Sequence, residues 1–369
     1  MATLARHSGV VQDQAGNIIP NAKIEVRRET PGAPLAALKE DRDGLVGLSN
    51  PFDAEADGSF AFHVIGGAYK VRAYVGASGA PTFEYIERFV ANGTAAEHDA
   101  EDFVAAGTVR ERLTADRTYH VAPSGSGGSD SNDGLTALAP FLTIQKAVDV
   151  AATVDLAGYK ITIQLADGTY TAGVVLKNVG GFAAPGDLVI KGNTTTPANV
   201  IVSPTSADAF LADSIASVWD VTDLKIQTTT SGNGLFARYG AKIRYGNLNF
   251  GTCASSHIQA FGPGSVITCL SNYAITGGAQ IHFQSYYGAQ IVAAGRTITI
   301  TGTLTISIFA DMRVLGSAQL FSMTFAGTYT VTGSRYRSQE NAVCFVNGAG
   351  ATYFPGNSSG TTATGGLYT

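Results

Sequence analysis

The chain has 369 residues, of which 45% are hydrophobic and only 14% are charged, and it contains 44 glycines. Soluble globular domains carry about 25% charged residues, so this composition predicts a mainly β chain of short strands and turns. No apolar stretch approaches the ~18 residues that a membrane-spanning helix needs, and Met1–His7 lack the apolar core of a secretory signal. We therefore expect neither membrane insertion nor export by the secretory route.

Cysteine usage points to the compartment in which the chain folds. Cys253, Cys269 and Cys344 cannot all pair within one chain, so we expect no disulfide framework. The chain is then made and folded in a reducing cytoplasm, and release of an assembled particle by lysis is one way for it to work outside the cell.

The net charge of −5 is unevenly distributed. Residues 1–223 hold 16 Lys and Arg against 27 Asp and Glu, whereas residues 224–369 hold 8 against 2. Between Asp223 and Asp311 there is no carboxylate at all. The negative total and the lack of a basic stripe argue against nucleic acid as a partner.

Residues 1–100 are predicted to form a small antiparallel β-sandwich. Polar and apolar residues alternate over 23–27, 59–64 and 69–75, with turn residues such as Asp57-Gly58 between these segments. Alternation with a period of two is typical of strands that bury one face. Residues 101–118 are charged and lack this alternation, which indicates a connecting segment.

Residues 119–346 are predicted to form a parallel β-helix, because a pattern recurs every 24 residues. Gly240-Ala241-Lys242-Ile243 is followed at that interval by similar segments that place an aliphatic residue in register. The four aliphatic residues are Ile243, Ile267, Ile291 and Leu315. Stacked coils share one core, so these residues are expected to form an interior ladder.

The open end of such a stack needs a cover, since unpaired strand edges invite aggregation. Thr143 is a plausible N-cap, and Ile144, Ala147, Val148 and Ala151 recur at helical spacing. We therefore expect a capping helix near 143–153. Residues 347–369 are expected to form a Gly/Thr-rich C-terminal segment.

Two parts of the sequence resemble known families. Gly9–Ala22, Ala56–Phe62 and Gly67–Val71 are similar to an N-terminal domain of phage fibre and spike proteins, which usually faces the particle. Tyr119-His120-Val121, followed by Asp133–Thr136 and Thr143–Ala147, resembles the opening of a pectate-lyase-like, right-handed parallel β-helix of phage tail or head spikes, including those of gene-transfer particles. The resemblance implies a homotrimer on a virion or phage-like particle that is assembled in the bacterial cytoplasm.

Catalysis has little support in the sequence. Glycoside hydrolysis needs two carboxyl groups at the cleaved bond, and calcium needs several oxygen ligands, yet the four 24-residue steps contain only Asp311. Asp220 and Asp223 are expected on opposite strand faces, as solvated strand ends. His257 and His282 lie 25 residues apart without a third ligand. We predict no catalytic residues, no metal site and no cofactor.

Binding features are better represented, in the form of aromatic and arginine residues that we place at the coil edges. Tyr and Trp suit stacking on sugar rings, and Arg pairs with acidic groups. The candidates for glycan binding are Trp219, Arg238, Tyr239, Arg244, Tyr245, Tyr273, Tyr286 and Tyr287. The alternative is that these aromatic residues pack against neighbouring subunits.

The function expected from these features is that of a particle-borne spike that binds a host-surface polysaccharide. Its N-terminal domain would contact other particle proteins. A polysaccharide depolymerase, hydrolase or lyase, with a site shared between subunits is the alternative, and a purely structural fibre segment is the second.

Overall fold

The computed structural model describes residues 4–29, 32–92 and 110–369. The chain divides into two compact units, Met1–Arg110 and Glu111–Thr369. Both are built almost entirely of β-strands, as the sequence predicted.

The N-terminal unit contains two antiparallel sheets that enclose one core. In the described residues, one sheet has the order β1 (Ala5–Val10), β6 (Ser59–Val64), β3 (Leu38–Lys39), β4 (Gly47–Leu48), and the other has the order β5 (Phe52–Asp53), β2 (Lys23–Arg28), β7 (Gly67–Ala77), β8 (Ala80–Asn92). Phe62 and Val64 of the first sheet are buried with Ile24 and Val71 of the second. The predicted β-sandwich is confirmed.

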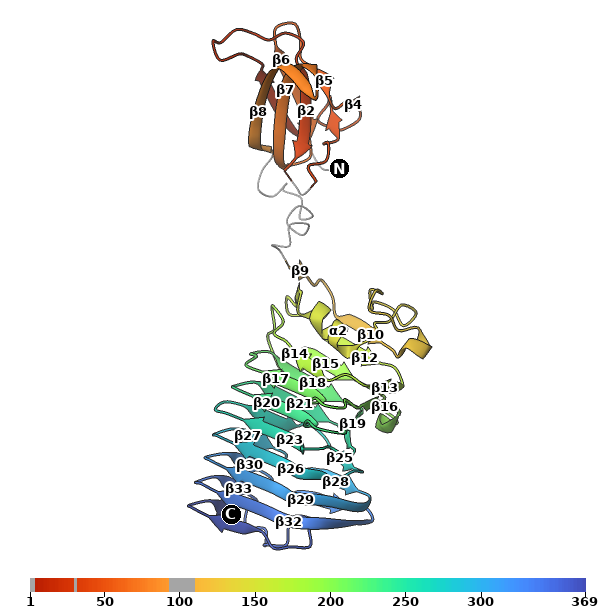
Figure 1. The fold of residues 1–369 in the computed structure, drawn as a ribbon, viewed down its shortest axis with the longest axis vertical. Helices are drawn as coiled ribbons and strands as arrows, with labels where there is room; N and C mark the ends of the chain where they lie inside the picture. Colours follow the sequence, from red (N-terminus) through yellow and green to blue (C-terminus); the bar gives the residue numbers. More distant parts are fainter. Residues whose placement is uncertain (1–3, 30–31, 93–109) are drawn as a thin grey trace. The chain divides into compact units, whose positions relative to one another are not determined.

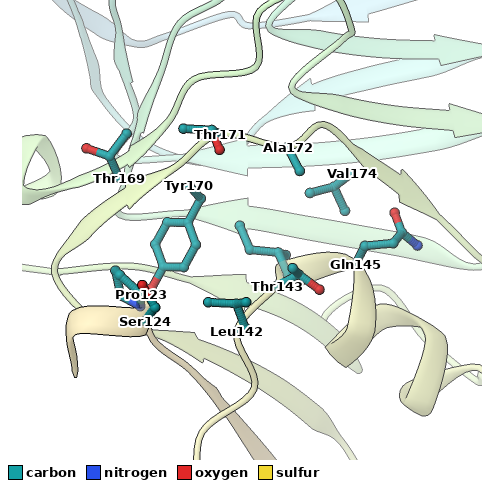
Figure 2. A pocket seen from close by; sticks show the side chains of 11 residues that line it. Pro123, Ser124, Leu142, Thr143, Gln145, Thr169, Tyr170, Thr171, Ala172 and Val174 are labelled. Carbon is teal, nitrogen blue, oxygen red and sulfur yellow. The ribbon is translucent and has the colours of Figure 1, made fainter. Parts of the chain in front are cut away.

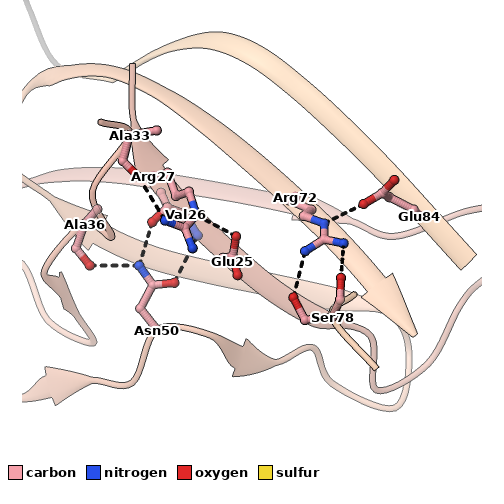
Figure 3. A network of polar contacts seen from close by, with 9 residues as sticks. All are labelled: Glu25, Val26, Arg27, Ala33, Ala36, Asn50, Arg72, Ser78 and Glu84. Carbon is pink, nitrogen blue, oxygen red and sulfur yellow. Dashed lines mark hydrogen bonds and ion pairs between the residues drawn. The ribbon is translucent and has the colours of Figure 1, made fainter. Parts of the chain in front are cut away.

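Polar side chains tie a loop of this unit to its sheet (Figure 3). The Asn50 amide nitrogen donates to the carbonyl oxygens of Val26 and Ala36 at 2.6 and 2.8 Å, and its oxygen accepts from the Val26 amide at 3.0 Å. Arg72 donates to Glu84 at 2.6 Å and to Ser78. The bonds of Asn50, and that of Arg72 to the Ser78 carbonyl, satisfy backbone groups, whereas the bond to Glu84 joins two side chains.

The C-terminal unit is a parallel β-solenoid of about eight turns (Figure 1). Each full coil contributes one strand to each of three sheets. In the described part of the chain, sheet 1 has ten strands, sheet 2 seven and sheet 3 eight.

Sheet 1 stacks β10 (Arg117–Val121), β12 (Ile161–Leu165), β15 (Leu188–Lys191), β18 (Val218–Thr222), β21 (Lys242–Gly246), β24 (Val266–Cys269), β27 (Gln290–Val292), β30 (Ser317–Gln319), β33 (Val343–Phe345) and β35 (Leu367–Tyr368). Sheet 2 stacks β13 (Gly168–Tyr170), β16 (Val200–Val202), β19 (Lys225–Ile226), β22 (Asn249–Phe250), β25 (Tyr273–Ile275), β28 (Thr297–Ile300) and β31 (Thr324–Ala326). Sheet 3 stacks β14 (Val174–Leu176), β17 (Phe210–Asp213), β20 (Leu235–Arg238), β23 (Ser256–Phe261), β26 (Ala279–Tyr286), β29 (Gly302–Arg313), β32 (Tyr329–Gln339) and β34 (Thr361–Ala363). Two short 3₁₀ helices, η1 (Ser124–Ser126) and η2 (Pro197–Asn199), interrupt the connections.

The predicted interior ladder is confirmed for three of its four members. Ile243, Ile267 and Ile291 are paired in register and fully buried. The residue that continues the ladder is Ala318, 27 positions after Ile291. The prediction for Leu315 is wrong, because this coil is longer than 24 residues: the offset between paired strands is already 25 at Tyr273–Ile298 and 27 from Ala279–Ile306 onward. Leu315 instead lies in a turn and is 64% exposed.

The predicted capping helix is present as α2 (Ile144–Ala151). The Thr143 side chain accepts a hydrogen bond from the Lys146 amide at 3.1 Å, which satisfies one of the free donors of the first turn. The apolar face of the helix lies against the solenoid core. It consists of Ile144, Ala147, Val148 and Ala151, all of them buried.

The ends of the solenoid differ from the expected segment boundaries. Residues 101–109 of the expected connecting segment lie outside the described residues. The remainder belongs to the solenoid, because β9 (Glu111–Arg112) pairs with β11 (Val154–Asp155). Likewise, β34 and β35 of the C-terminal segment extend sheets 3 and 1. In the part of the chain that the structure describes, no helix is long and apolar enough to span a membrane.

Candidate functional site

Three of the eight predicted glycan-binding residues lie inside the solenoid. Trp219 and Tyr245 are completely buried and Tyr273 is 3% exposed. Trp219 pairs with Ile243 of the ladder, and its indole nitrogen donates to the Lys177 carbonyl at 2.9 Å. Their prediction as surface residues is therefore wrong, since interior rings cannot stack on an external sugar.

Arg244 lies on the outer face of sheet 1, away from the other arginine and tyrosine candidates of sheet 3. Its guanidinium pairs with both oxygens of Asp220 on the preceding coil, at 2.6 and 2.5 Å. The paired carboxylate is only 5% exposed. Arg244 thus neutralises a nearly buried charge and joins two coils.

The remaining four candidates gather along one edge of sheet 3, where successive coils leave that sheet. The pairing register aligns Arg238 with Phe261, Phe261 with Tyr286, and Tyr286 with Arg313. We call this set, with the two tyrosines of the adjoining turns, the aromatic ridge. The aromatic ridge consists of Arg238, Tyr239, Phe261, Tyr286, Tyr287 and Arg313.

Tyr239 and Tyr287 are the most exposed members of the ridge, at 55% and 50%. Both have a φ of 54°, in the left-handed region, at the tight turn between sheet 3 and sheet 1. Phe261 lies between them, with its ring centre 5.8 Å from that of Tyr239 and 4.9 Å from that of Tyr287. The three rings form a continuous row across three coils.

The two arginines of the ridge are in different electrostatic states. Arg238 pairs with Asp213 at 2.6 Å and lies over the rings of Phe236 and Tyr239. Its hydrogen bond holds the pKa of Asp213 below the usual range. Arg313 lies 4.8 Å from the ring centre of Tyr286, and among the described residues it has no carboxylate partner.

A buried aspartate, Asp311, holds one residue of the aromatic ridge in place. Asp311 is completely buried and accepts two hydrogen bonds from Arg337, at 2.7 and 2.6 Å. It also accepts a hydrogen bond from the Tyr286 hydroxyl. Burial, followed by this contact, raises the pKa of Tyr286, so the phenol stays protonated and fixed in place.

The other carboxylates of the solenoid's middle coils are engaged in the same way. Asp208 accepts from the Asn233 amide at 2.7 Å, and Asp223 accepts from the Asn247 side chain at 2.7 Å. Asp223 is 8% exposed. Asp220 and Asp223 are therefore not the solvated strand ends that the sequence suggested, because each joins neighbouring coils.

His257 and His282 do lie together, but in the interior. Their Nδ1 atoms are 3.0 Å apart, His257 Nε2 is 3.0 Å from the Gly251 carbonyl, and His282 Nε2 is 2.7 Å from the Tyr273 hydroxyl. A single proton arrangement satisfies all three contacts: the Tyr273 hydroxyl donates to His282, His282 donates to His257, and His257 donates to the Gly251 carbonyl. All four ring nitrogens are thus occupied, and among the described residues no cluster of three or more His, Cys, Asp or Glu fits a metal ion.

A pocket of about 270 Å³ lies beside the capping helix (Figure 2). Leu142, Thr143, Gln145 and Tyr170 face into it. The Tyr170 hydroxyl is already bound to the Val121 and Ala166 carbonyls, at 3.0 and 2.8 Å. The polar groups of this pocket serve the junction between helix and first coil.

The chain matches no protein-family model, and none of the curated proteins is similar to it in sequence. The sequence candidates include four of the six members of the aromatic ridge. Phe261 and Arg313 were not among them, and the position of Arg313 opposite Tyr286 depends on the longer coil between the two residues.

Proposed function

We propose that the protein is a particle-borne spike whose solenoid binds a host-surface polysaccharide along the aromatic ridge. The observation that carries this proposal is the row of Tyr239, Phe261 and Tyr287, with two half-exposed tyrosines on a scaffold of stacked coils. A tyrosine presents an apolar face and a polar hydroxyl, which matches a sugar ring.

The direction of the ridge suits a linear, repeating ligand. Neighbouring strands lie about 4.8 Å apart, and Tyr239, Phe261 and Tyr287 come from three consecutive coils. A polymer that contacts all three rings must run along the solenoid axis. Little ordering is needed on the protein side, because each turn is fixed by bonds to the next coil, such as Tyr239 N to Phe261 O at 3.1 Å.

The place of the protein on a particle rests on the resemblance to phage spikes, both of the N-terminal sandwich and of the opening of the solenoid. In this proposal the sandwich contacts other particle proteins, the spike is a homotrimer, and the solenoid faces the host. A trimer is compatible with binding only if the aromatic ridge remains outside the contacts between subunits.

Replacing the two exposed tyrosines tests the proposal. The Tyr239→Ser/Tyr287→Ser variant is expected to bind a host polysaccharide about tenfold or more weakly, because each stacking contact contributes about 1 kcal/mol. Binding is measured by biolayer interferometry on immobilised polysaccharides from the host surface. Tyr159→Ser is the matched control, since Tyr159 is an exposed solenoid tyrosine outside the ridge.

The same experiment separates the alternatives. Wild-type protein that shortens the polymer or leaves unsaturated ends is a depolymerase. Wild-type protein that binds no host polysaccharide is a structural segment, and the proposal fails. Unchanged binding by the double variant would place the glycan site elsewhere than on the ridge.

A further inference from the structure

We infer that the polysaccharide bound by the ridge is acidic, and that Arg313 pairs with its anionic group. This inference rests on the proposed function, because it concerns the same surface. The outer face of the solenoid carries several arginines, and they differ in whether a carboxylate pairs with them.

Three of these arginines are neutralised by the fold. Arg238, Arg244 and Arg337 each pair with an aspartate of a neighbouring coil, at 2.5–2.6 Å. Such pairs are used within the protein and leave little charge for a ligand. Arg313, Arg296 and Arg335 form no ion pair with any described residue. Arg296 and Arg335 donate to the carbonyls of Cys269 and Ser358, at 3.3 and 3.2 Å, and neither belongs to the aromatic ridge. Arg313 is therefore the arginine of the ridge that has no carboxylate partner among the described residues.

The one carboxylate near Arg313 in its own strand is not available to it. Asp311 lies two residues earlier in β29, but its two oxygens are taken by Arg337 and Tyr286. The Asp311–Arg337 pair has no net charge, so it does not neutralise Arg313. Glu340 lies on the next coil, where its carbonyl accepts from the Leu315 amide at 3.0 Å, but its carboxylate forms no ion pair with Arg313. Further along, the chain between Asp223 and Asp311 has no carboxylate to supply a partner.

Neighbouring side chains also fix the position of the Arg313 guanidinium. Its guanidinium lies over the Tyr286 ring, 4.8 Å from the centre, and the Tyr286 hydroxyl is fixed by Asp311. A planar guanidinium held in this way is suited to a carboxylate or phosphate group, which it can bind with two parallel hydrogen bonds. Tyr287, next to Tyr286, supplies an exposed ring for the sugar that carries that group.

Pairs of acidic polymers and their neutral derivatives test this inference. The probes are capsular polysaccharides rich in uronic acid, with and without reduction of the carboxyl groups, and phosphomannan, with and without phosphatase treatment. The full-length wild-type protein is expected to bind an acidic form at least tenfold more tightly than its neutral form. Whichever acidic form binds identifies the carboxylate or the phosphate as the group that is recognised.

Variants show whether Arg313 makes the distinction. Arg313→Gln is expected to weaken binding of the acidic polymer about tenfold to a hundredfold, as for loss of a charge-assisted hydrogen bond, and to leave the neutral form unchanged. Arg313→Lys should restore part of the affinity. Lys160→Gln removes the same charge from an exposed turn of the first coil and should have little effect.

The outcomes separate this inference from the proposed function. Equal binding of acidic and neutral forms, lost in Tyr239→Ser/Tyr287→Ser, would retain the glycan-binding spike and overturn the acidic ligand. Preference for the acidic form that persists in Arg313→Gln would overturn the role of Arg313. Binding to no polymer in either form would overturn both.

Discussion

At the scale of single residues, the buried histidine pair is the feature most sensitive to solution conditions. Burial lowers the pKa of His257 to about 4, and burial followed by the neighbouring His257 lowers the pKa of His282 well below its ordinary value. Both imidazoles are neutral in the folded state, where the donor chain from Tyr273 to Gly251 satisfies them.

Acidification is therefore expected to destabilise the solenoid. Between pH 6.5 and pH 4 the unfolded chain binds protons at these histidines and the folded chain does not, so the free energy of unfolding falls as the pH falls. From pH 7 to pH 5 each histidine contributes a loss of about 2 kcal/mol. The measurement is guanidinium unfolding followed by the fluorescence of Trp219, the single tryptophan.

Two variants make this measurement specific. His282→Gln should lose about 2 kcal/mol less stability than wild type between the two pH values. Phe283→Leu changes a fully buried neighbour without altering a proton site, so it should lower stability equally at both. A wild-type stability that is the same at pH 7 and pH 5 would contradict the neutral pair.

Residue-level prediction of the site failed where the alternation within a strand was not applied. Tyr245 lies two positions after Ile243 in β21, so the two side chains share a face and Tyr245 had to be interior. Trp219 lies 24 residues before Ile243, which is the spacing of the ladder, so Trp219 also had to be interior. Tyr239 and Tyr287 immediately precede the glycine of the repeat and lie in turns, which is why their exposure was predictable.

At the scale of the elements, α2 shows how one short helix protects the stack. Ala147 is completely buried between the helix and the first coil. Ala147→Glu is expected to destabilise the solenoid by several kcal/mol, because it places an unpaired carboxylate in the core. Unfolding monitored by Trp219 fluorescence, together with light scattering for aggregation, measures the effect.

Lys146→Glu is the control for the capping helix. It introduces the same side chain one position earlier, on the partly exposed face and in the first turn, where the helix dipole favours a negative charge. We expect it to unfold like the wild type. Equal stability of Ala147→Glu and Lys146→Glu would show that the helix does not cover the core.

The elements themselves were largely predictable from periodicity, and the coil lengths were not. The predicted ranges 59–64 and 69–75 lie in β6 and β7, because alternation of polar and apolar residues is typical of a half-buried strand. Leu315 was misplaced because insertions in a solenoid are accommodated between its strands: the offset grows from 25 at Ile275–Ile300 to 27 at Ala279–Ile306, in the connection that leads into β29. A fixed 24-residue step does not detect them.

At the scale of the whole molecule, the chain contains two hydrophobic cores that share no residue. The N-terminal core is formed by residues between Val11 and Ala73, and the solenoid core by residues between Leu113 and Phe354. Each core is closed by its own elements, the solenoid's by α2 at its first coil. A unit with its own core is expected to fold alone.

The isolated fragment 111–369 is therefore expected to keep both the stability and the binding of the solenoid. Its unfolding midpoint by Trp219 fluorescence should equal that of the full chain, because the N-terminal core contributes no residue to the environment of that probe. Its affinity for an acidic polysaccharide should also match, since the whole aromatic ridge lies within it. A midpoint well below that of the full chain would mean that the N-terminal unit stabilises the solenoid, and a loss of affinity with an unchanged midpoint would mean that binding requires the whole spike.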